Sequence, residues 1–287
     1  MVVRRGKPFA EKRRFAGCRQ ANQNHAFHEP TEDTLRMTFD DWVAALEKRH
    51  LADLRLPELT RALRALSSAY VERRHTVGRG GPLDSAGKRA AFALFYAPLH
   101  FLTATYVIRA LDDAVAAAPS SVLDIGCGTG AAGAAWAVTC GGTPRLTGID
   151  RHPWAIDEAR WTYRMLELTG TARQGDVMRL PRLDRGSAVI AAYVLNELPS
   201  DKRDRVLEQL FTAGAHGVRV LILEPIARAV TPWWDDASVQ AARAGGRTDE
   251  WRFREPLPPL LQILDKAAGL DHRELTVRSM WLPGGAA

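Results

Sequence analysis

The sequence predicts an α/β fold: a mainly parallel sheet with helices on both faces, preceded by an N-terminal helical extension. Three observations support this prediction. Short apolar runs alternate with helical patterns from about residue 90 to residue 280. A glycine-rich turn follows the first apolar run, at residues 126–130. Acidic residues close several of the later runs, as expected where parallel strands end at a ligand-binding edge.

Residues 121–130, Ser-Val-Leu-Asp-Ile-Gly-Cys-Gly-Thr-Gly, are the stretch around which the domain is organised. Glycines in such a turn let the backbone approach a ligand and adopt positive φ angles. The spacing Gly126-x-Gly128-x-Gly130 differs from the G-x-G-x-x-G turn of dinucleotide sites, and Asp124 precedes it. An acid at this turn is compatible with a positively charged sulfonium cofactor, which has no phosphate to place there.

The run from Asp124 to Gly130 resembles motif I of class I S-adenosylmethionine (SAM)-dependent methyltransferases. The resemblance implies a Rossmann-like methyltransferase fold with SAM as cofactor. It also implies that Asp150 holds the ribose hydroxyls and that Asp176 lies at the adenine amino group. The expected cofactor-binding residues are Asp124, Gly126, Cys127, Gly128, Gly130, Asp150, Asp176 and Val177. The alternative is a Rossmann-like domain that binds another nucleotide or none.

Three residues after the fourth predicted strand, Tyr193, Asn196 and Glu197, are the catalytic candidates, because in this fold that segment faces the transferred methyl group. Residues 195–198, Leu-Asn-Glu-Leu, resemble the Leu-His-Asp-Trp run of plant-type O-methyltransferases, with asparagine in place of the general-base histidine. Asparagine cannot act as a base near neutral pH. Glu197 is either a base or a support for the loop. In the preceding helix, Tyr96 or His100 could face SAM.

A second, weaker resemblance is to the methyltransferase-like family associated with the small ribosomal subunit. It rests on three short runs: Tyr-Ala-Pro at 96–98, Asn-Glu-Leu-Pro at 196–199 and Glu-Pro at 224–225. That family carries a cysteine cluster after the fifth strand, whereas residues 226–256 contain no cysteine. We therefore expect no metal or iron–sulfur site.

The charge of the chain is unevenly distributed. Residues 1–30 hold seven basic and two acidic residues, a net charge of +5, which leaves +1 of the total +6 for residues 31–287. Residues 1–33 also lack hydrophobic periodicity, so we expect a disordered basic arm that is either solvated or in contact with RNA phosphates. The candidate partners are therefore ribosomal RNA or the small ribosomal subunit, or a small-molecule acceptor.

Cysteine use and hydropathy suggest a cytoplasmic location. The three cysteines indicate no disulfide framework, no signal peptide is visible, and no apolar run reaches the length of a membrane span, so we expect no membrane association. We divide the chain into the arm 1–33, a helical extension 34–88 and a SAM-binding domain 89–287.

Two further expectations concern the ends of that domain. Pro98 should break or kink the helical region 85–117, and the chain after residue 282 leaves little room for a seventh strand. Residues 226–256, with Trp233 and Trp234, form an insertion that is either a lid over the site or a packed surface elaboration.

The leading function is SAM-dependent methyl transfer. Two alternatives stay open: a SAM-binding ribosome-assembly or scaffold protein with little catalysis, and a SAM-using enzyme that does not transfer a methyl group. The sequence does not specify the acceptor atom or the oligomeric state.

Overall fold

The computed structural model describes residues 38–285, apart from 53, 73–82, 112–113 and 115–117. The expected arm 1–33 lies outside the described residues. Residues 35–287 form one compact unit, to which the helices of the expected extension belong. The boundary that we placed at residue 88 falls inside α3 (Ala86–Ala91).

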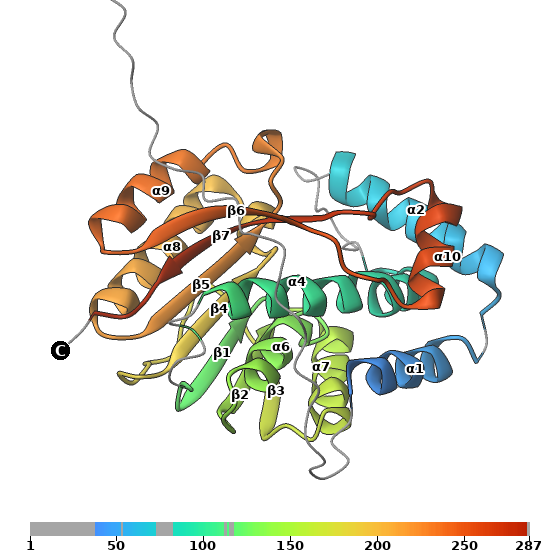
Figure 1. The fold of residues 1–287 in the computed structure, drawn as a ribbon, viewed down its shortest axis with the longest axis horizontal. Helices are drawn as coiled ribbons and strands as arrows, with labels where there is room; N and C mark the ends of the chain where they lie inside the picture. Colours follow the sequence, from blue (N-terminus) through green and yellow to red (C-terminus); the bar gives the residue numbers. More distant parts are fainter. Residues whose placement is uncertain (1–37, 53, 73–82, 112–113, 115–117, 286–287) are drawn as a thin grey trace, which may run out of the picture. The chain divides into compact units, whose positions relative to one another are not determined.

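A seven-stranded sheet in the order β3-β2-β1-β4-β5-β7-β6 forms the centre of this unit (Figure 1). The first five strands are parallel, and β7 runs antiparallel between β5 and β6. The strands are β1 (Ser121–Ile125), β2 (Arg145–Asp150), β3 (Gly170–Gln174), β4 (Ala188–Ala192), β5 (Arg219–Glu224), β6 (Arg247–Phe253) and β7 (Leu275–Leu282). This mixed sheet confirms the predicted Rossmann-like methyltransferase fold.

Helices cover both faces of the sheet. The strand residues of β4 show this directly, because Ala188 and Ile190 pack into one apolar core and Val189 and Ala191 into the other. The first core contains residues of helices α1 (Phe39–His50), α2 (Leu56–Glu72), α3, α4 (Ala97–Ala110), α6 (Ala131–Thr139), α7 (Pro153–Met165) and α10 (Pro259–Ala268). The second contains residues of α8 (Ser200–Ala215) and α9 (Trp234–Arg243).

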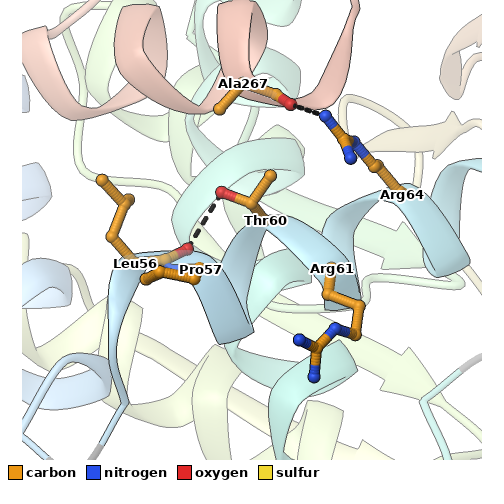
Figure 2. Close-up of a pocket in the computed structure, with 6 residues that line it drawn as sticks. All are labelled: Leu56, Pro57, Thr60, Arg61, Arg64 and Ala267. Carbon is orange, nitrogen blue, oxygen red and sulfur yellow. Dashed lines mark hydrogen bonds between the residues drawn. The ribbon is translucent and has the colours of Figure 1, made fainter.

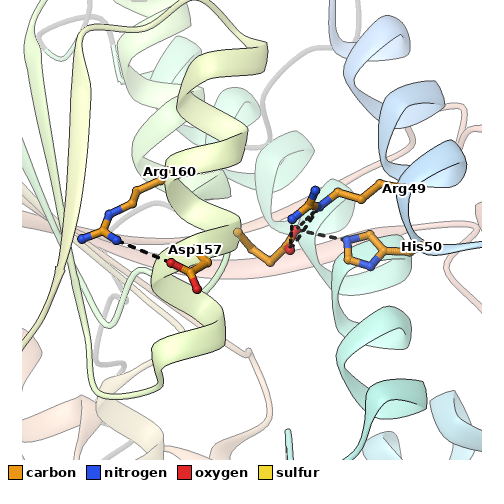
Figure 3. A network of polar contacts seen from close by, with 5 residues as sticks. Arg49, His50, Asp157 and Arg160 are labelled. Carbon is orange, nitrogen blue, oxygen red and sulfur yellow. Dashed lines mark hydrogen bonds and ion pairs between the residues drawn. The ribbon is translucent and has the colours of Figure 1, made fainter.

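Helix α1 begins at a capping box. The Thr38 hydroxyl accepts the Asp41 N–H, and the Asp41 carboxylate accepts the Thr38 N–H, so two otherwise unpaired donors are satisfied. At the other end, Arg49 donates to both carboxylate oxygens of Glu158 on α7, and His50 Nε2 lies 3.1 Å from Glu158 Oε2 (Figure 3). Burial opposes ionisation of Glu158, but the His50 and Arg49 contacts outweigh it and lower its pKa. These contacts join α1, in the N-terminal extension, to helix α7, which connects β2 and β3.

The helical region before β1 is continuous. Helix α3 passes through a π-helical segment, η1 (Phe92–Tyr96), directly into α4, whose first turn contains Pro98. Our prediction of a break at Pro98 was therefore wrong: the Ala97 N–H already donates to the Phe92 carbonyl in the π turn, so the i→i−4 ladder is interrupted just before the proline, which has no N–H. The wider π turn changes the register instead, and such segments occur often at functional sites.

The same run corrects our reading of the hydropathy. Residues Ala86–Ala110 form one helix that is long and apolar enough to cross a membrane by length and composition alone. However, 67% of its most apolar window is buried inside the structure. That burial is typical of a helix in the core of a globular domain.

The expectation of little room for a seventh strand was also wrong. Residues 247–253 form β6 at the edge of the sheet, paired antiparallel with β7. Its sequence, Arg-Thr-Asp-Glu-Trp-Arg-Phe, is mostly polar because an edge strand faces solvent, so it shows no apolar alternation. Upstream of it, Trp233 and Trp234 are 8% and 5% exposed and belong to the second core. These tryptophans are packed inward, as in the surface-elaboration alternative.

Tyr163 on α7 occupies a space lined by glycines of three segments. A Cβ atom on Gly148 would lie 2.7 Å from the Tyr163 hydroxyl and 2.8 Å from Cys127 Sγ, and one on Gly130 would lie 2.5 Å from the Tyr163 ring. Real Cβ atoms do not approach that closely, so the absence of side chains there lets α7 pack against the glycine turn.

We predict that Gly148→Ala destabilises the fold by about 1–3 kcal/mol through overpacking against Tyr163, measured by urea denaturation. Tyr163→Phe is the control, because the buried Tyr163 hydroxyl has no hydrogen-bond partner among the described residues. It should cost less than Gly148→Ala, and combining the two changes should recover part of the loss. A Gly148→Ala protein as stable as the original would contradict the packing described here.

Candidate active site

The turn between β1 and α6, residues 126–130, has the backbone conformation that a cofactor cradle requires. Gly126, Gly128 and Gly130 have φ angles of +65°, +50° and +78°, in the region that favours glycine. A Cβ on Gly126 would lie 2.3 Å from Val194 Cγ2, so this turn packs closely on the segment after β4. Cys127 between them is buried, which raises the pKa of its thiol well above the usual range. It packs against its surroundings and is not a reactive thiol.

Asp150, at the end of β2, holds the glycine turn in place. One carboxylate oxygen, Oδ2, accepts the Gly128 N–H at 2.9 Å, and Oδ1 accepts the His152 N–H at 2.8 Å. A carboxylate has about four lone-pair sites, so two remain for a ligand. The structure therefore leaves Asp150 able to accept two adjacent ribose hydroxyls, the role that the family resemblance implies.

Asp124 has a different environment. It is 1% exposed, and its Oδ2 accepts the N–H of Gly133 in α6 at 2.9 Å. Burial raises the pKa of Asp124 to about 7, the Gly133 hydrogen bond opposes this rise, and the nearby charge of Asp150 adds to it. Its side chain connects β1 to α6, so its contribution to a cofactor site is through the position of the turn.

Asp176 and Val177 follow β3. The Asp176 side chain is exposed and its Oδ1 accepts the Met178 N–H at 3.0 Å, while Val177 is partly buried against the second core. The exposed carboxylate and the adjacent apolar side chain are suited to the polar edge and the face of an adenine ring. This assignment stays a prediction.

Glu224, the fully buried last residue of β5, supports the turn after β4 through its carboxylate. Glu224 Oε1 accepts the N–H groups of Leu195 and Asn196, at 3.0 and 3.2 Å. Sequence reasoning left Glu224 out of the site, although a carboxylate at the end of a buried apolar strand was a usable signal. It fixes the 193–197 segment close to the glycine turn.

The three catalytic candidates differ in their environments. Tyr193 has a φ of +57°, which is uncommon for a residue other than glycine and occurs often at functional sites. The Asn196 Oδ1 atom is buried and has no hydrogen-bond partner among the described residues. Glu197 lies exposed in the short helix η2 (Leu195–Glu197). The structure thus places Tyr193 and Asn196 partly buried and Glu197 exposed to solvent.

An aromatic cluster, consisting of Phe92, Tyr96, His100 and Tyr193, lies between the helical run η1–α4 and the glycine turn. The rings of His100 and Tyr193 are stacked, with centroids 4.3 Å apart and an 18° angle between planes. Phe92 contacts Tyr96 and His100 edge-on or tilted, and its ring would lie 3.4 Å from a Cβ on Gly128. The cluster therefore connects the glycine turn with the segment after β4.

Burial shifts the titration of two cluster members. It lowers the pKa of His100 to about 4, so this imidazole is neutral at physiological pH. Burial also raises the pKa of the Tyr193 phenol; a Thr103 hydrogen bond opposes this rise, and the charge of Glu224 adds to it. Both rings are therefore uncharged, and neither is a strong base.

A separate groove of about 480 Å³ lies between α2 and α10 (Figure 2). Leu56, Pro57 and Thr60 line it together with Arg61, Arg64 and Ala267, and the Arg64 guanidinium reaches the Ala267 carbonyl. None of the predicted site residues lines this groove.

Comparison with known proteins agrees with this geometry. Residues 122–217 match the family model of a methyltransferase domain. No curated protein matches the sequence. The sheet, the glycine turn and this match agree with the motif I resemblance: residues 122–217 carry a methyltransferase domain. The resemblance to the ribosomal-subunit family is not supported by these comparisons.

Solved structures similar to this chain are of low identity. One is the N-methyltransferase NodS from Bradyrhizobium japonicum in complex with S-adenosyl-L-homocysteine (SAH), with 16% identity, coverage of 65% of this chain and 88% of that one, and a TM-score of 0.44. The plantazolicin methyltransferase BpumL with SAH has 14% identity, coverage of 82% and 98%, and a TM-score of 0.47. The mitomycin 7-O-methyltransferase MmcR has 16% identity, coverage of 85% and 71%, and a TM-score of 0.44.

We predict that Asp150→Ala weakens SAM binding by about 1.5–3 kcal/mol, roughly 10- to 150-fold, through loss of hydrogen bonds to a charged group. Isothermal calorimetry measures the dissociation constant. Asp157→Ala is the control, because Asp157 is an exposed acid on α7 that pairs with Arg160 at the surface (Figure 3). NAD should not bind either protein. Unchanged SAM affinity in a folded Asp150→Ala protein would remove Asp150 from the cofactor site.

Asp124 should make stability depend on pH. Its pKa is about 7 in the folded protein against an ordinary 3.8, so between these values the folded state holds a proton that the unfolded state has lost. Stability therefore falls as pH rises through this window, by at most about 1.4 kcal/mol per pH unit. Asp124→Asn keeps an acceptor for the Gly133 N–H and cannot ionise.

The Asp124→Asn protein should gain stability relative to the original by about 2–3 kcal/mol between pH 5 and pH 8, measured by urea denaturation at each pH. Taking the difference between the two proteins cancels the titration of groups that do not interact with Asp124. Parallel stability curves for the two proteins would contradict the raised pKa.

Proposed function

We propose that the chain is a cytoplasmic enzyme that transfers the methyl group of SAM to a small-molecule acceptor bound at the aromatic cluster. The observation that carries this proposal is the position of Phe92, His100 and Tyr193, whose rings connect the glycine turn with the segment after β4. In this account, Asp150 and the glycine turn hold SAM, and the cluster orients the acceptor.

The methyl-transfer step depends little on general acid–base catalysis. SAM supplies an activated methyl group on sulfur, and its transfer is an in-line displacement, so holding the acceptor at near-attack distance does much of the work. Asn196 and Tyr193 are assigned to positioning the acceptor, because neither side chain is a base under physiological conditions. The exposed Glu197 is retained as a secondary candidate for accepting a proton from the product.

Ribosomal RNA is the second candidate acceptor, favoured by one observation. The seven basic and two acidic residues within the first 30 would attract phosphates, and such binding weakens as salt increases. Under this alternative the arm binds RNA and delivers a base to the same site.

Deleting residues 1–30 distinguishes a small-molecule acceptor from a ribosomal RNA acceptor. For a small-molecule acceptor, SAH formation with a panel of small molecules should be unchanged within about twofold by the deletion, and isolated ribosomal RNA should not be methylated. The assay is SAH formation by the full chain and by the deleted chain, with both kinds of acceptor. Methylation of ribosomal RNA that falls after the deletion, with the difference between the two chains largest at low salt, would reject the small-molecule proposal in favour of RNA.

A further inference from the structure

Uncharged aromatic rings, the buried carboxylate of Glu224 and the buried Oδ1 atom of Asn196 surround the segment after β4. Together they indicate the chemical class of the acceptor. Resting on the function proposed above, we propose that the acceptor atom is an uncharged nitrogen with at least one N–H, as in an amine, and that Asn196 Oδ1 receives that N–H. Asn196 is thereby a specificity-determining residue.

The first support comes from the charge balance of the reaction. The nitrogen lone pair forms the new N–CH₃ bond as the S–CH₃ bond breaks, and the bonding pair stays on sulfur, which leaves neutral SAH. The nitrogen becomes an ammonium and later releases a proton to solvent. A positive charge is thus present before, during and after transfer. A site for this chemistry should stabilise a cation throughout.

The surroundings of Tyr193 meet that requirement. Aromatic faces attract cations, and the rings of Phe92, His100 and Tyr193 have no arginine or lysine over them among the described residues. Such cation–π contacts in the described part of the chain are made by Trp161, Trp233 and Trp234. The fully buried Glu224 lies directly beneath the turn that carries Asn196 and adds negative potential.

The second support is that the buried part of the described site lacks a base suited to a hydroxyl acceptor, since Glu197 lies exposed to solvent. A phenol or alcohol must lose its proton for efficient attack, whereas a neutral amine already has a free lone pair. The carboxylates of Asp124, Asp150 and Glu224 each accept backbone N–H groups and serve the loops. The imidazole of His100, stacked on Tyr193, binds protons weakly because burial lowers its pKa to about 4.

The third support is the buried Oδ1 atom of Asn196, which has no hydrogen-bond partner in the part of the chain that the structure describes. A buried carbonyl oxygen without a donor is costly, so such atoms usually have one, and a ligand can supply it. The Asn196 backbone is fixed by Glu224, so the side chain is presented from a rigid position. A ligand N–H completes this site.

Calorimetry with three ligands tests the inference on the full chain. SAH is neutral at sulfur, SAM carries a methylsulfonium, and sinefungin carries an ammonium on carbon in the corresponding position. Sinefungin should bind at least tenfold more tightly than SAH. Asn196→Ala should remove most of that preference while changing the SAH dissociation constant less than threefold. Asn196→Asp, which keeps an acceptor oxygen and adds negative charge, should retain or increase the preference.

Each remaining outcome has a defined meaning. Equal affinities for sinefungin and SAH in the original protein, or a preference unaffected by Asn196→Ala, would overturn the assignment of Asn196 and of a nitrogen acceptor while leaving SAM-dependent transfer intact. Absence of binding by SAM, SAH and sinefungin alike would overturn the proposed function as well. Thermal melting of each variant, expected to match the original within a few degrees, shows that the protein tested is folded.

Discussion

The carboxylate of Asp150 is the contact on which the cofactor site depends. It accepts N–H groups from two separate segments, Gly128 in the turn after β1 and His152 before α7. Both segments leave the sheet at neighbouring parallel strands. The Gly126 and Cys127 N–H groups donate to the Ile149 carbonyl of β2, and Asp150 extends this connection between β2 and the turn to Gly128.

Two other carboxylates act in the same way at the same edge of the sheet. Asp124 connects β1 to Gly133 of α6, and Glu224 supports the backbone of Leu195 and Asn196 after β4. Buried carboxylates cost desolvation energy, and hydrogen bonds from backbone N–H groups offset part of it. Because these bonds join protein groups to one another, they fix the positions of the loops at this edge of the sheet. Such preorganisation is what an in-line transfer reaction requires, since it needs orientation more than acid–base catalysis.

The parts of this architecture that the sequence revealed are those encoded over short distances. The glycine turn at 126–130, the apolar strands and the acids that end them each occupy a few consecutive residues, and the structure places them at one sheet edge. Strand β6 was missed because its polar edge sequence has no apolar alternation. The fit of Tyr163 among glycines was missed because it joins three segments that are distant in sequence.

The site shows the same division. Asp150 could be assigned from the family resemblance, whereas the support of Asn196 by Glu224 is a contact between residues 28 positions apart. The stacking of His100 on Tyr193 likewise depends on how α4 lies over the sheet. Whether Tyr96 or His100 faced the site could not be chosen from periodicity, because both lie in a run that is buried on most sides and contains a π-helical turn.

Hydrogen exchange of the glycine turn tests most directly whether Asp150 preforms the cofactor site. Exchange of the peptide that contains residues 126–130 would be measured by mass spectrometry in the ligand-free original protein, in Asp150→Ala and in Asp157→Ala. If Asp150 holds the turn, exchange there should accelerate at least tenfold in Asp150→Ala alone, while β1 and α6 remain protected. Equal exchange in all three proteins would show that the turn keeps its shape without this carboxylate.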